Sequence, residues 1–306
     1  MEHNDNALVS VCVICYNSSS TVLETLDSIK KQTYSNLELI ISDDCSTDNT
    51  VEVCSKWLEL NKQRFVNVTL ISSNVNTGMS ANYNRAINQA KGNWIKTIDG
   101  DDTLVDSCIT DLIEFSKRDR FDIAFTRMHP FGEGADAGAV SCRNLSRIFA
   151  ELTDKERLII LTRINYLPSP SSFLHKDIFK KIGFFDESIP FIEDWPFWIK
   201  ASYNGCNIKY LDKVTVNYRI HSESVSQKRS TRISEIFMDS RIKAVKYACS
   251  IGGQLGLLEK LYYSIIALKV THKAPIYKYV TIISFLNPFT YRFMSLRRKF
   301  NNLMGD

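Results

Sequence analysis

Residues 94–102 read WIKTIDGDD, and this stretch decides both the fold class and the candidate site. Its apolar first half is typical of a buried strand in a parallel sheet. Three carboxylates, Asp99, Asp101 and Asp102, crowd together where that strand ends. Because like charges this close repel one another, the cluster predicts a bound divalent cation such as Mg²⁺ or Mn²⁺, which takes oxygen ligands. The alternative is an acidic turn that caps a helix beginning at Thr103.

The chain before this stretch alternates buried strands with amphipathic helices. Apolar, β-branched runs predict strands at Val9–Ile14, Leu37–Ser42 and Val68–Ser72. Helices are expected between them: one from a Thr21–Glu24 capping box to Gln32, one capped by Ser46 or Asp48, and one over Ser80–Ala90. The alternation predicts an α/β fold with a mostly parallel, doubly wound sheet, in which ligands bind at the carboxyl ends of the strands.

The elements after residue 102 follow a less regular pattern, and residues 127–150 show no clear period. We expect helices at Thr103–Arg118, Asp154–Ile164 and His175–Ile182, a helix beginning in Phe191–Trp198, strands at Asp122–Thr126 and Ile208–Tyr218, and a rigid turn at Leu167–Ser172.

The composition, 44% apolar and 24% charged, is that of a globular protein. The polar N-terminus, MEHNDNALVS, predicts no signal peptide, and no run approaches the ~18–20 apolar residues of a membrane span. We interpret the eight scattered cysteines as reduced, which predicts a cytoplasmic location. Cys12 and Cys15 form a C-x-x-C in a predicted strand, where their side chains point to opposite faces, so we expect no metal or redox site there.

The net charge is unevenly distributed along the chain. From Lys228 onward there are 14 Lys and Arg residues and 4 Asp and Glu residues, a net of +10, and since the whole chain carries +4, residues 1–227 carry −6. The pattern after Ser230 is almost wholly helical, with breaks near Pro275 and Pro288. These features predict a domain over residues 1–227 and a basic helical extension over 228–306.

The extension combines apolar patches with basic residues. The patches are Ile265, Ile266 and Leu268, and Tyr279, Ile282, Ile283 and Phe285; the basic residues around them are Lys260, Lys269, Lys273, Lys278 and Arg297–Lys299. Such helices could lie in a membrane interface beside anionic lipid. A bundle packed on the main domain, or a dimer contact, would explain the same pattern.

Six spaced stretches together resemble family 2 glycosyltransferases of the GT-A fold. They are VSVCVICYN (9–17), QTYSNLELIISDDCSTDNT (32–50), NVNTGMSANYN (74–84), WIKTIDGDD (94–102), FIEDWPFW (191–198) and YRIHSESVS (218–226), and the match covers about residues 8–227. The resemblance implies transfer of a sugar from a nucleotide diphosphate with inversion at the anomeric carbon.

The resemblance also implies a nucleotide-sugar site. Tyr16 matches a residue that stacks on the base, and Asp44 one that accepts a hydrogen bond from it, with Asp43 in support. Asp99 and Asp101 match the D-x-D that meets the ribose and the metal. The site is completed by Asn17, Asn76, Gly78, Asn84, Arg85 and Arg219, of which Arg219 could pair either with a phosphate or with a surface acid.

The metal and the base are implied in the same way. Asp101, Asp102 and His221 would bind Mn²⁺ or Mg²⁺, although His221 could equally be structural. Asp194 matches the catalytic base, with Glu193 assisting; simple helix capping is the alternative. Two positions depart from the family: Cys15 stands where threonine is common, and Tyr83 where arginine is usual, although Arg85 is close by.

The implied function is metal-dependent, inverting transfer from a UDP-hexose or UDP-N-acetylhexosamine. The expected acceptor is a saccharide linked to a polyprenyl diphosphate, at the cytoplasmic face of a bacterial inner membrane. A nucleotidyltransferase would need a glycine-rich, basic loop after the first strand, where residues 15–20 read CYNSSS. A dehydrogenase would need a G-x-G-x-x-G motif after a strand, and this sequence has none there. A carbohydrate- or lipid-binding protein with a degenerate site is the non-enzymatic alternative. We expect no nucleic-acid partner.

Overall fold

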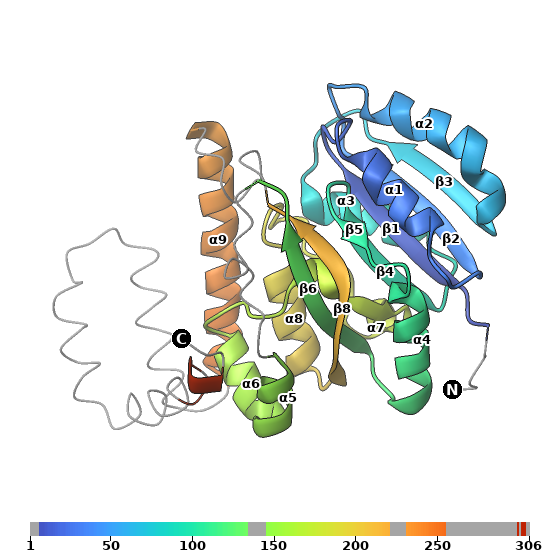
Figure 1. Ribbon diagram of the computed structural model, residues 1–306. Helices are drawn as coiled ribbons and strands as arrows, with labels where there is room; N and C mark the ends of the chain where they lie inside the picture. The colour runs from blue at the N-terminus through green and yellow to red at the C-terminus, as the bar shows by residue number, and fades with distance from the viewer. Residues whose placement is uncertain (1–5, 134–144, 221–230, 255–298, 300, 304–306) are drawn as a thin grey trace, which may run out of the picture.

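The computed structural model describes residues 6–133, 145–220, 231–254, 299 and 301–303 (Figure 1). Within these residues the strands form one eight-stranded sheet in the order β3-β2-β1-β4-β7-β6-β8-β5. The α/β fold predicted from the sequence is confirmed, and the sheet divides into a parallel half and a mixed half.

The parallel half contains the strands that precede residues 99–102, which we call the acidic turn. β1 (Val9–Cys15) pairs in parallel with β2 (Leu37–Asp43) on one side and β4 (Trp94–Asp99) on the other, and β3 (Asn67–Ser72) pairs with β2. The chain order therefore reverses between β1 and β4, the kind of switch point at which α/β sheets bind ligands. The connecting helices are α1 (Val22–Lys30), α2 (Thr50–Asn61, followed by η1, Lys62–Arg64) and α3 (Met79–Gln89).

The two faces of the sheet have separate cores. Val9, Val11 and Val13 of β1 pack with residues of α1, α2 and α4 (Cys108–Arg118), whereas Cys12 and Ile14 pack on the other face with α3 and α8. Cys12 and Cys15 thus lie on opposite faces, as predicted, and both thiols are free.

The mixed half is built from shorter and more distant segments. β7 (Phe173–His175) is antiparallel to both β4 and β6 (Ile123–Phe131), β8 (Ile208–Arg219) is parallel to β6, and the two-residue β5 (Thr103–Leu104) is antiparallel to β8. The remaining helices are α5 (Leu145–Glu151), α6 (Asp154–Leu161), α7 (Asp177–Ile182), α8 (Asp194–Tyr203) and α9 (Thr231–Gly252), with a single 3₁₀ turn η2 (Ser169–Ser171).

Two predicted boundaries are wrong in this half. Thr103 does not begin a helix but pairs with Asn217 of β8, and α4 begins five residues later. His175 ends strand β7 rather than beginning α7. In both places the strand pairs with residues far along the chain, which local periodicity cannot reveal.

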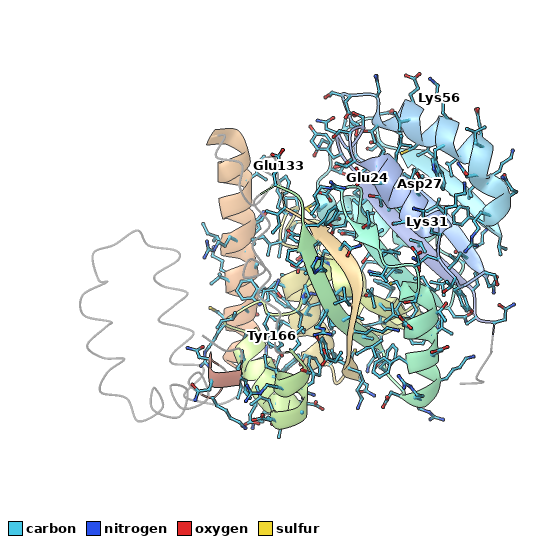
Figure 2. All side chains as sticks on the ribbon, viewed as in Figure 1. Glu24, Asp27, Lys31, Lys56, Glu133 and Tyr166 are labelled. Carbon is cyan, nitrogen blue, oxygen red and sulfur yellow. The ribbon has the colours of Figure 1, made fainter. Side chains whose placement is uncertain are left out.

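The predicted capping box of α1 is also wrong. The hydroxyl of Thr21 donates to the carbonyl of Gly100 at 2.8 Å, and Glu24 forms an ion pair with Arg219 at 2.5 Å. Figure 2 shows Glu24 on α1. Both side chains therefore join the first helix to the acidic turn and to β8 rather than cap the helix.

The C-terminal part that the structure describes packs on the main domain. Ala248 and Ile251 of α9, together with Leu303, are buried in the same core as α5 and α8. Lys299 donates to the carbonyl of Glu151 at 3.0 Å. Among the described helices none is long and apolar enough to cross a membrane. The apolar patches at 265–285 and the expected boundary at 227/228 lie outside the described residues.

Candidate active site

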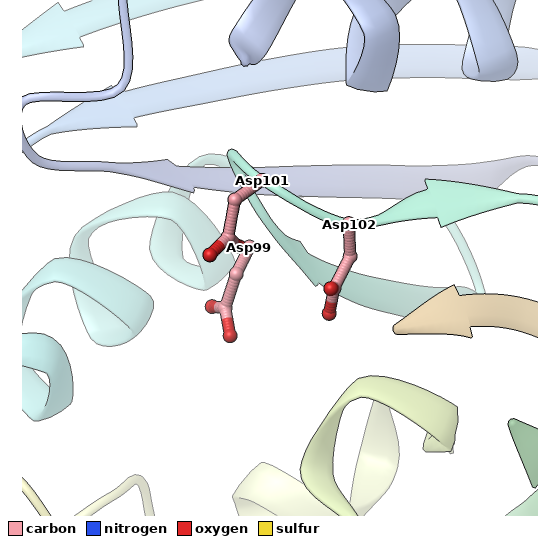
Figure 3. Close-up of side chains that lie close together, drawn as sticks. All are labelled: Asp99, Asp101 and Asp102. Atoms are coloured by element: carbon pink, nitrogen blue, oxygen red, sulfur yellow. The ribbon is translucent and has the colours of Figure 1, made fainter. Parts of the chain in front are cut away.

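The ladder register places the acidic turn beside the end of β1. Asp43 lies opposite Cys15, and Asp99 lies opposite Ile14, so the ends of β2 and β4 flank the end of β1. Ligand oxygens of Asp99, Asp101 and Asp102 all lie within 4.8 Å of one another. Figure 3 shows the three carboxylates on the same side of the turn.

The carboxylates of this turn are costly to ionise together. Burial raises the pKa of Asp99 to about 7, repulsion from Asp101 adds to the shift, and hydrogen bonding from Tyr83 opposes it. Burial and the charges of Asp101 and Asp99 likewise raise the pKa of Asp102. Such a cluster is electrostatically strained until a positive ligand shares it.

One carboxylate oxygen in the turn has no protein partner. Oδ1 of Asp102 accepts the backbone N–H of Arg219 at 2.8 Å, but Oδ2 is buried without a hydrogen bond among the described residues. An orphaned buried oxygen beside two further carboxylates fits a hard divalent cation, which prefers oxygen ligands. His221, the third expected metal ligand, lies outside the described residues.

Tyr83 takes part in the site, although the sequence indicated it only as a departure from the family pattern. Its hydroxyl donates to Oδ1 of Asp99 at 2.5 Å, and its ring is almost fully buried. Burial and the neighbouring acidic charges raise the pKa of Tyr83, so it remains a hydrogen-bond donor. Its place on the inner side of α3 was the available signal, because a tyrosine buried there needs a partner for its hydroxyl.

The loop after β1, which carries Tyr16 and Asn17, lies at the switch point between β1 and β4. Tyr16 is 49% exposed, which leaves its ring face available to a ligand. Asn17 adopts a positive φ of 52°, and its side-chain oxygen accepts the N–H of Thr47 at 2.8 Å. Asn17 therefore fixes the loop that carries Tyr16 to the loop after β2. Asn76 is exposed in the loop between β3 and α3.

Asp43 and Asp44 are buried and already hydrogen-bonded to protein. Asp43 accepts the N–H of Ser46 at 2.9 Å. Oδ2 of Asp44 accepts the backbone N–H groups of Thr77 and Gly78 at 2.8 and 2.7 Å. Asp44 therefore fixes the backbone of the loop before α3.

Arg85 and Asn84 face inward instead of reaching the acidic turn. Arg85 forms an ion pair with Asp44 at 3.2 Å. The Asn84 amide donates to the carbonyl of Phe185 at 2.9 Å and accepts its N–H at 3.1 Å. Asn84 thus holds the segment that leads to α8, and Arg85 neutralises Asp44.

Gly78 is the point where this loop meets that segment. Its φ is +86°, and a Cβ built on it would lie 2.5 Å from Cβ of Pro190. Two residues on, the Ser80 hydroxyl donates to the carbonyl of Ile189 at 2.5 Å. Only glycine permits this close approach between the loop before α3 and the segment before α8.

Glu193 and Asp194 lie at the start of α8. Oδ1 of Asp194 accepts the N–H of Trp195 at 2.7 Å, and Oδ2 accepts the side-chain amide of Asn165 at 2.9 Å. Burial raises the pKa of Asp194, whereas these hydrogen bonds lower it. The charge of Asp194 also raises the pKa of Asp99, so the structure brings this helix start within electrostatic reach of the acidic turn. Glu193 is buried, and burial followed by repulsion from Asp194 raises its pKa.

Arg219 fastens the acidic turn to the ends of β6 and β8. Its Nε donates to the carbonyl of Asp101 at 2.7 Å, and its guanidinium lies 4.4 Å from the ring centroid of Phe131. Arg219 also forms its ion pair with Glu24, an acid at the surface of α1.

Comparison with known proteins agrees with this geometry. Residues 10–183 match the family model described as glycosyl transferase family 2. The chain is 28% identical over 242 residues to a UDP-Glc:alpha-D-GlcNAc-diphosphoundecaprenol beta-1,3-glucosyltransferase, WfaP, of Escherichia coli, covering 78% of this chain and 88% of that protein.

Solved structures share the fold. TarS residues 1–349 of S. aureus in complex with UDP superimposes with a TM-score of 0.61 at 23% identity, covering 86% of this chain and 70% of that one. The mannosyltransferase PcManGT of Pyrobaculum calidifontis, in complex with GDP-Man and Mn²⁺, gives a TM-score of 0.56 at 15% identity, with 89% and 83% covered. The chain belongs to glycosyl transferase family 2 and is a glycosyltransferase of the GT-A fold.

Proposed function

We propose that this enzyme transfers a sugar, with inversion and with Mn²⁺ or Mg²⁺, from a UDP-sugar to a hydroxyl of a lipid-linked saccharide. The observation that carries the proposal is the cluster of Asp99, Asp101 and Asp102, whose ligand oxygens lie within 4.8 Å of one another at the switch point. Asp194, whose charge acts on Asp99, supplies the second group that the reaction needs.

The donor lies across the ends of β1, β2 and β4. Tyr16 stacks on the base, which its exposed ring allows, and Asp99 meets the ribose or the diphosphate. Asp43, Asp44, Asn84 and Arg85 contribute indirectly. Asp44 and Arg85 fix the loop before α3, Asp43 holds Ser46 in the loop after β2, and Asn84 holds the segment that leads to α8. UDP in the TarS complex supports uracil as the base.

Asp101 and Asp102 would hold the divalent cation, and the orphaned Oδ2 of Asp102 is an oxygen that a cation could satisfy. A bound cation supplies Lewis-acid stabilisation of the leaving nucleoside diphosphate. His221 remains a predicted third ligand. Arg219 keeps the turn in place through the Asp101 carbonyl.

Asp194 is the general base that takes the proton of the acceptor hydroxyl. The N–H of Trp195 and the amide of Asn165 stabilise its ionised form, in which it can accept a proton. The hydroxyl then attacks the anomeric carbon from the face opposite the diphosphate, so the configuration inverts and no covalent enzyme intermediate is formed. Glu193 supports the helix start.

The acceptor proposed here follows the name of the E. coli relative, which acts on a GlcNAc-diphosphoundecaprenol. Such an acceptor would place the enzyme at the cytoplasmic face of the inner membrane. The basic extension beyond residue 228 is the predicted point of peripheral membrane contact, and its apolar patches lie outside the described residues.

The test is a donor panel with one defined acceptor. UDP-glucose, UDP-GlcNAc and GDP-mannose are incubated with Mn²⁺ and a short-chain α-GlcNAc diphosphate lipid, and nucleotide release and product mass are measured. We expect transfer from a UDP-sugar, with a β linkage shown by the coupling constant of the new anomeric proton. Binding of UDP-sugars without transfer to this or any saccharide hydroxyl would instead favour a binding protein with a degenerate site.

A further inference from the structure

The carboxylate of Asp194 is held by a residue from outside its own helix. The amide of Asn165, in the segment between α6 and β7, donates to Oδ2 of Asp194 at 2.9 Å. The other oxygen accepts the N–H of Trp195, in the first turn of α8. Asn165 is exposed, and Asp194 is partly buried.

The residues around Asn165 are anchored, so its position is defined. Tyr166 is 3% exposed, and its hydroxyl donates to the carbonyl of Arg157 in α6 at 3.3 Å; Figure 2 shows this tyrosine beside α6. The indole N–H of Trp195 donates to the carbonyl of Leu161 at 2.6 Å. The Tyr166 bond therefore fastens the segment that carries Asn165 to α6, and the Trp195 bond joins the end of α6 to the start of α8.

The far end of the same segment is tied to the strand that bears the acidic turn. The fully buried Lys96 of β4 donates to the carbonyls of Thr97, at 2.9 Å, Ser172, at 3.3 Å, and Pro170. An ammonium has three donors, and here it meets three carbonyls. The segment from 165 to 172 thus connects the base on α8 to the carboxylates at the end of β4.

We propose that Asn165 is a positioning residue for the catalytic base: its amide orients the Asp194 carboxylate toward the acceptor, on a segment that Lys96 fixes to β4. The inference rests on the proposed role of Asp194. A donor on Oδ2 leaves one lone pair of that oxygen for the acceptor hydroxyl and restricts rotation of the carboxylate. Because the donor favours the ionised form, it also offsets part of the effect of burial on the Asp194 carboxyl.

The first test needs no substrate. Aspartate labelled with ¹³C at the side-chain carboxyl is incorporated into the full chain, and the Asp194 signal is assigned by its loss in Asp194→Asn. We expect this carboxyl to titrate at a higher pH in Asn165→Ala than in wild type, and at the wild-type pH in Asn204→Ala, a matched exposed asparagine at the other end of α8. An unchanged titration in Asn165→Ala would overturn the proposal.

The second test is a double-mutant cycle in the transfer assay. Asn165→Ala should lower kcat on the order of 10-fold, as expected for loss of a hydrogen bond to a charged group, with the donor KM unchanged. In the Asp194→Asn background, the same substitution should cost nothing further, because it acts through the carboxylate. Additive losses would assign Asn165 a separate structural role and contradict the inference.

The two proposals fail in different ways. If Asp194→Asn alone keeps wild-type turnover, the assignment of the base is wrong, and the carboxyl titration still decides whether Asn165 holds Asp194. If Asp194→Asn abolishes transfer while Asn165→Ala leaves kcat unchanged, the base stands and the positioning role does not.

Discussion

The two halves of the sheet differ in how far apart their pairing segments lie in the sequence. In the parallel half, β1, β2 and β3 follow one another through single helices, and β4 returns beside β1. In the mixed half, β4 pairs with β7 about 80 residues later, and β5 pairs with β8 more than 100 residues later. The first half carries the acidic turn and the exposed Tyr16, and the second carries Asp194 and Asn165. The comparison predicts that donor binding and proton transfer can be disturbed separately.

Removal of the divalent cation should have the largest effect, and it acts on the parallel half. Excess EDTA should abolish transfer, because the charge on the leaving diphosphate is then opposed by the clustered carboxylates. Asp101→Ala and Asp102→Ala should weaken UDP binding in Mn²⁺, measured by calorimetry. Full activity in excess chelator would contradict the metal assignment.

Loss of the base should act on the mixed half alone. Asp194→Asn should lower kcat by about 10²–10⁴, the usual contribution of general-base catalysis, and leave UDP affinity and the melting temperature nearly unchanged. Glu193→Gln should cost less, since Glu193 supports the helix start. If Asp194→Asn keeps more than about a tenth of wild-type turnover at saturating substrates, with chemistry rate-limiting, the base lies elsewhere.

A substitution at Gly78 tests the contact between the loop before α3, in the parallel half, and Pro190, in the segment before α8. Gly78→Ala should destabilise the protein by about 2–4 kcal/mol, because it combines a conformation almost restricted to glycine with a clash against Pro190. Gly205→Ala is the control: its φ is also positive, +66°, but a Cβ there would meet nothing within 4 Å. We expect about 1 kcal/mol for the control by urea unfolding. Equal losses would mean that the close approach to Pro190 is unimportant.

The smallest effect is expected at Asp48, in the loop before α2. Although partial burial opposes it, hydrogen bonding from Thr50 and Ser19 lowers the pKa of Asp48 to about 2. A lowered pKa stabilises the fold at pH values above the unfolded pKa of ~3.9, and this stabilisation is lost as the pH falls toward 2. Asp48→Asn should therefore cost roughly 0.5–1 kcal/mol at pH 7, typical of a residue at a helix start, and less at pH 3. If Asp48→Asn lowers the free energy of unfolding equally at pH 7 and pH 3, the stabilisation does not come from the ionised Asp48 carboxylate.

The sequence indicated the acidic turn at 99–102 because three carboxylates follow an apolar run, and the family resemblance pointed to Tyr16 and Asp194. Neither revealed what Asp44, Asn84 and Arg85 contact. Their partners are Thr77, Gly78 and Phe185, and only the packing of α3 between the two loops brings them together. For the same reason Tyr83 was expected only as a departure from a pattern.

By itself the sequence determined the parallel half of the sheet, since β1, β2 and most of β4 are continuous buried, mainly apolar runs and successive strands along the chain are separated by single amphipathic helices. It also determined the carboxylates at the end of β4, which lie within four consecutive residues. Only the tertiary structure decided that Thr103 pairs with Asn217, that Lys96 holds the turn before β7, and that Asn165 reaches Asp194. These contacts join residues that are far apart in the chain, and their geometry depends on how the two halves of the sheet pack together.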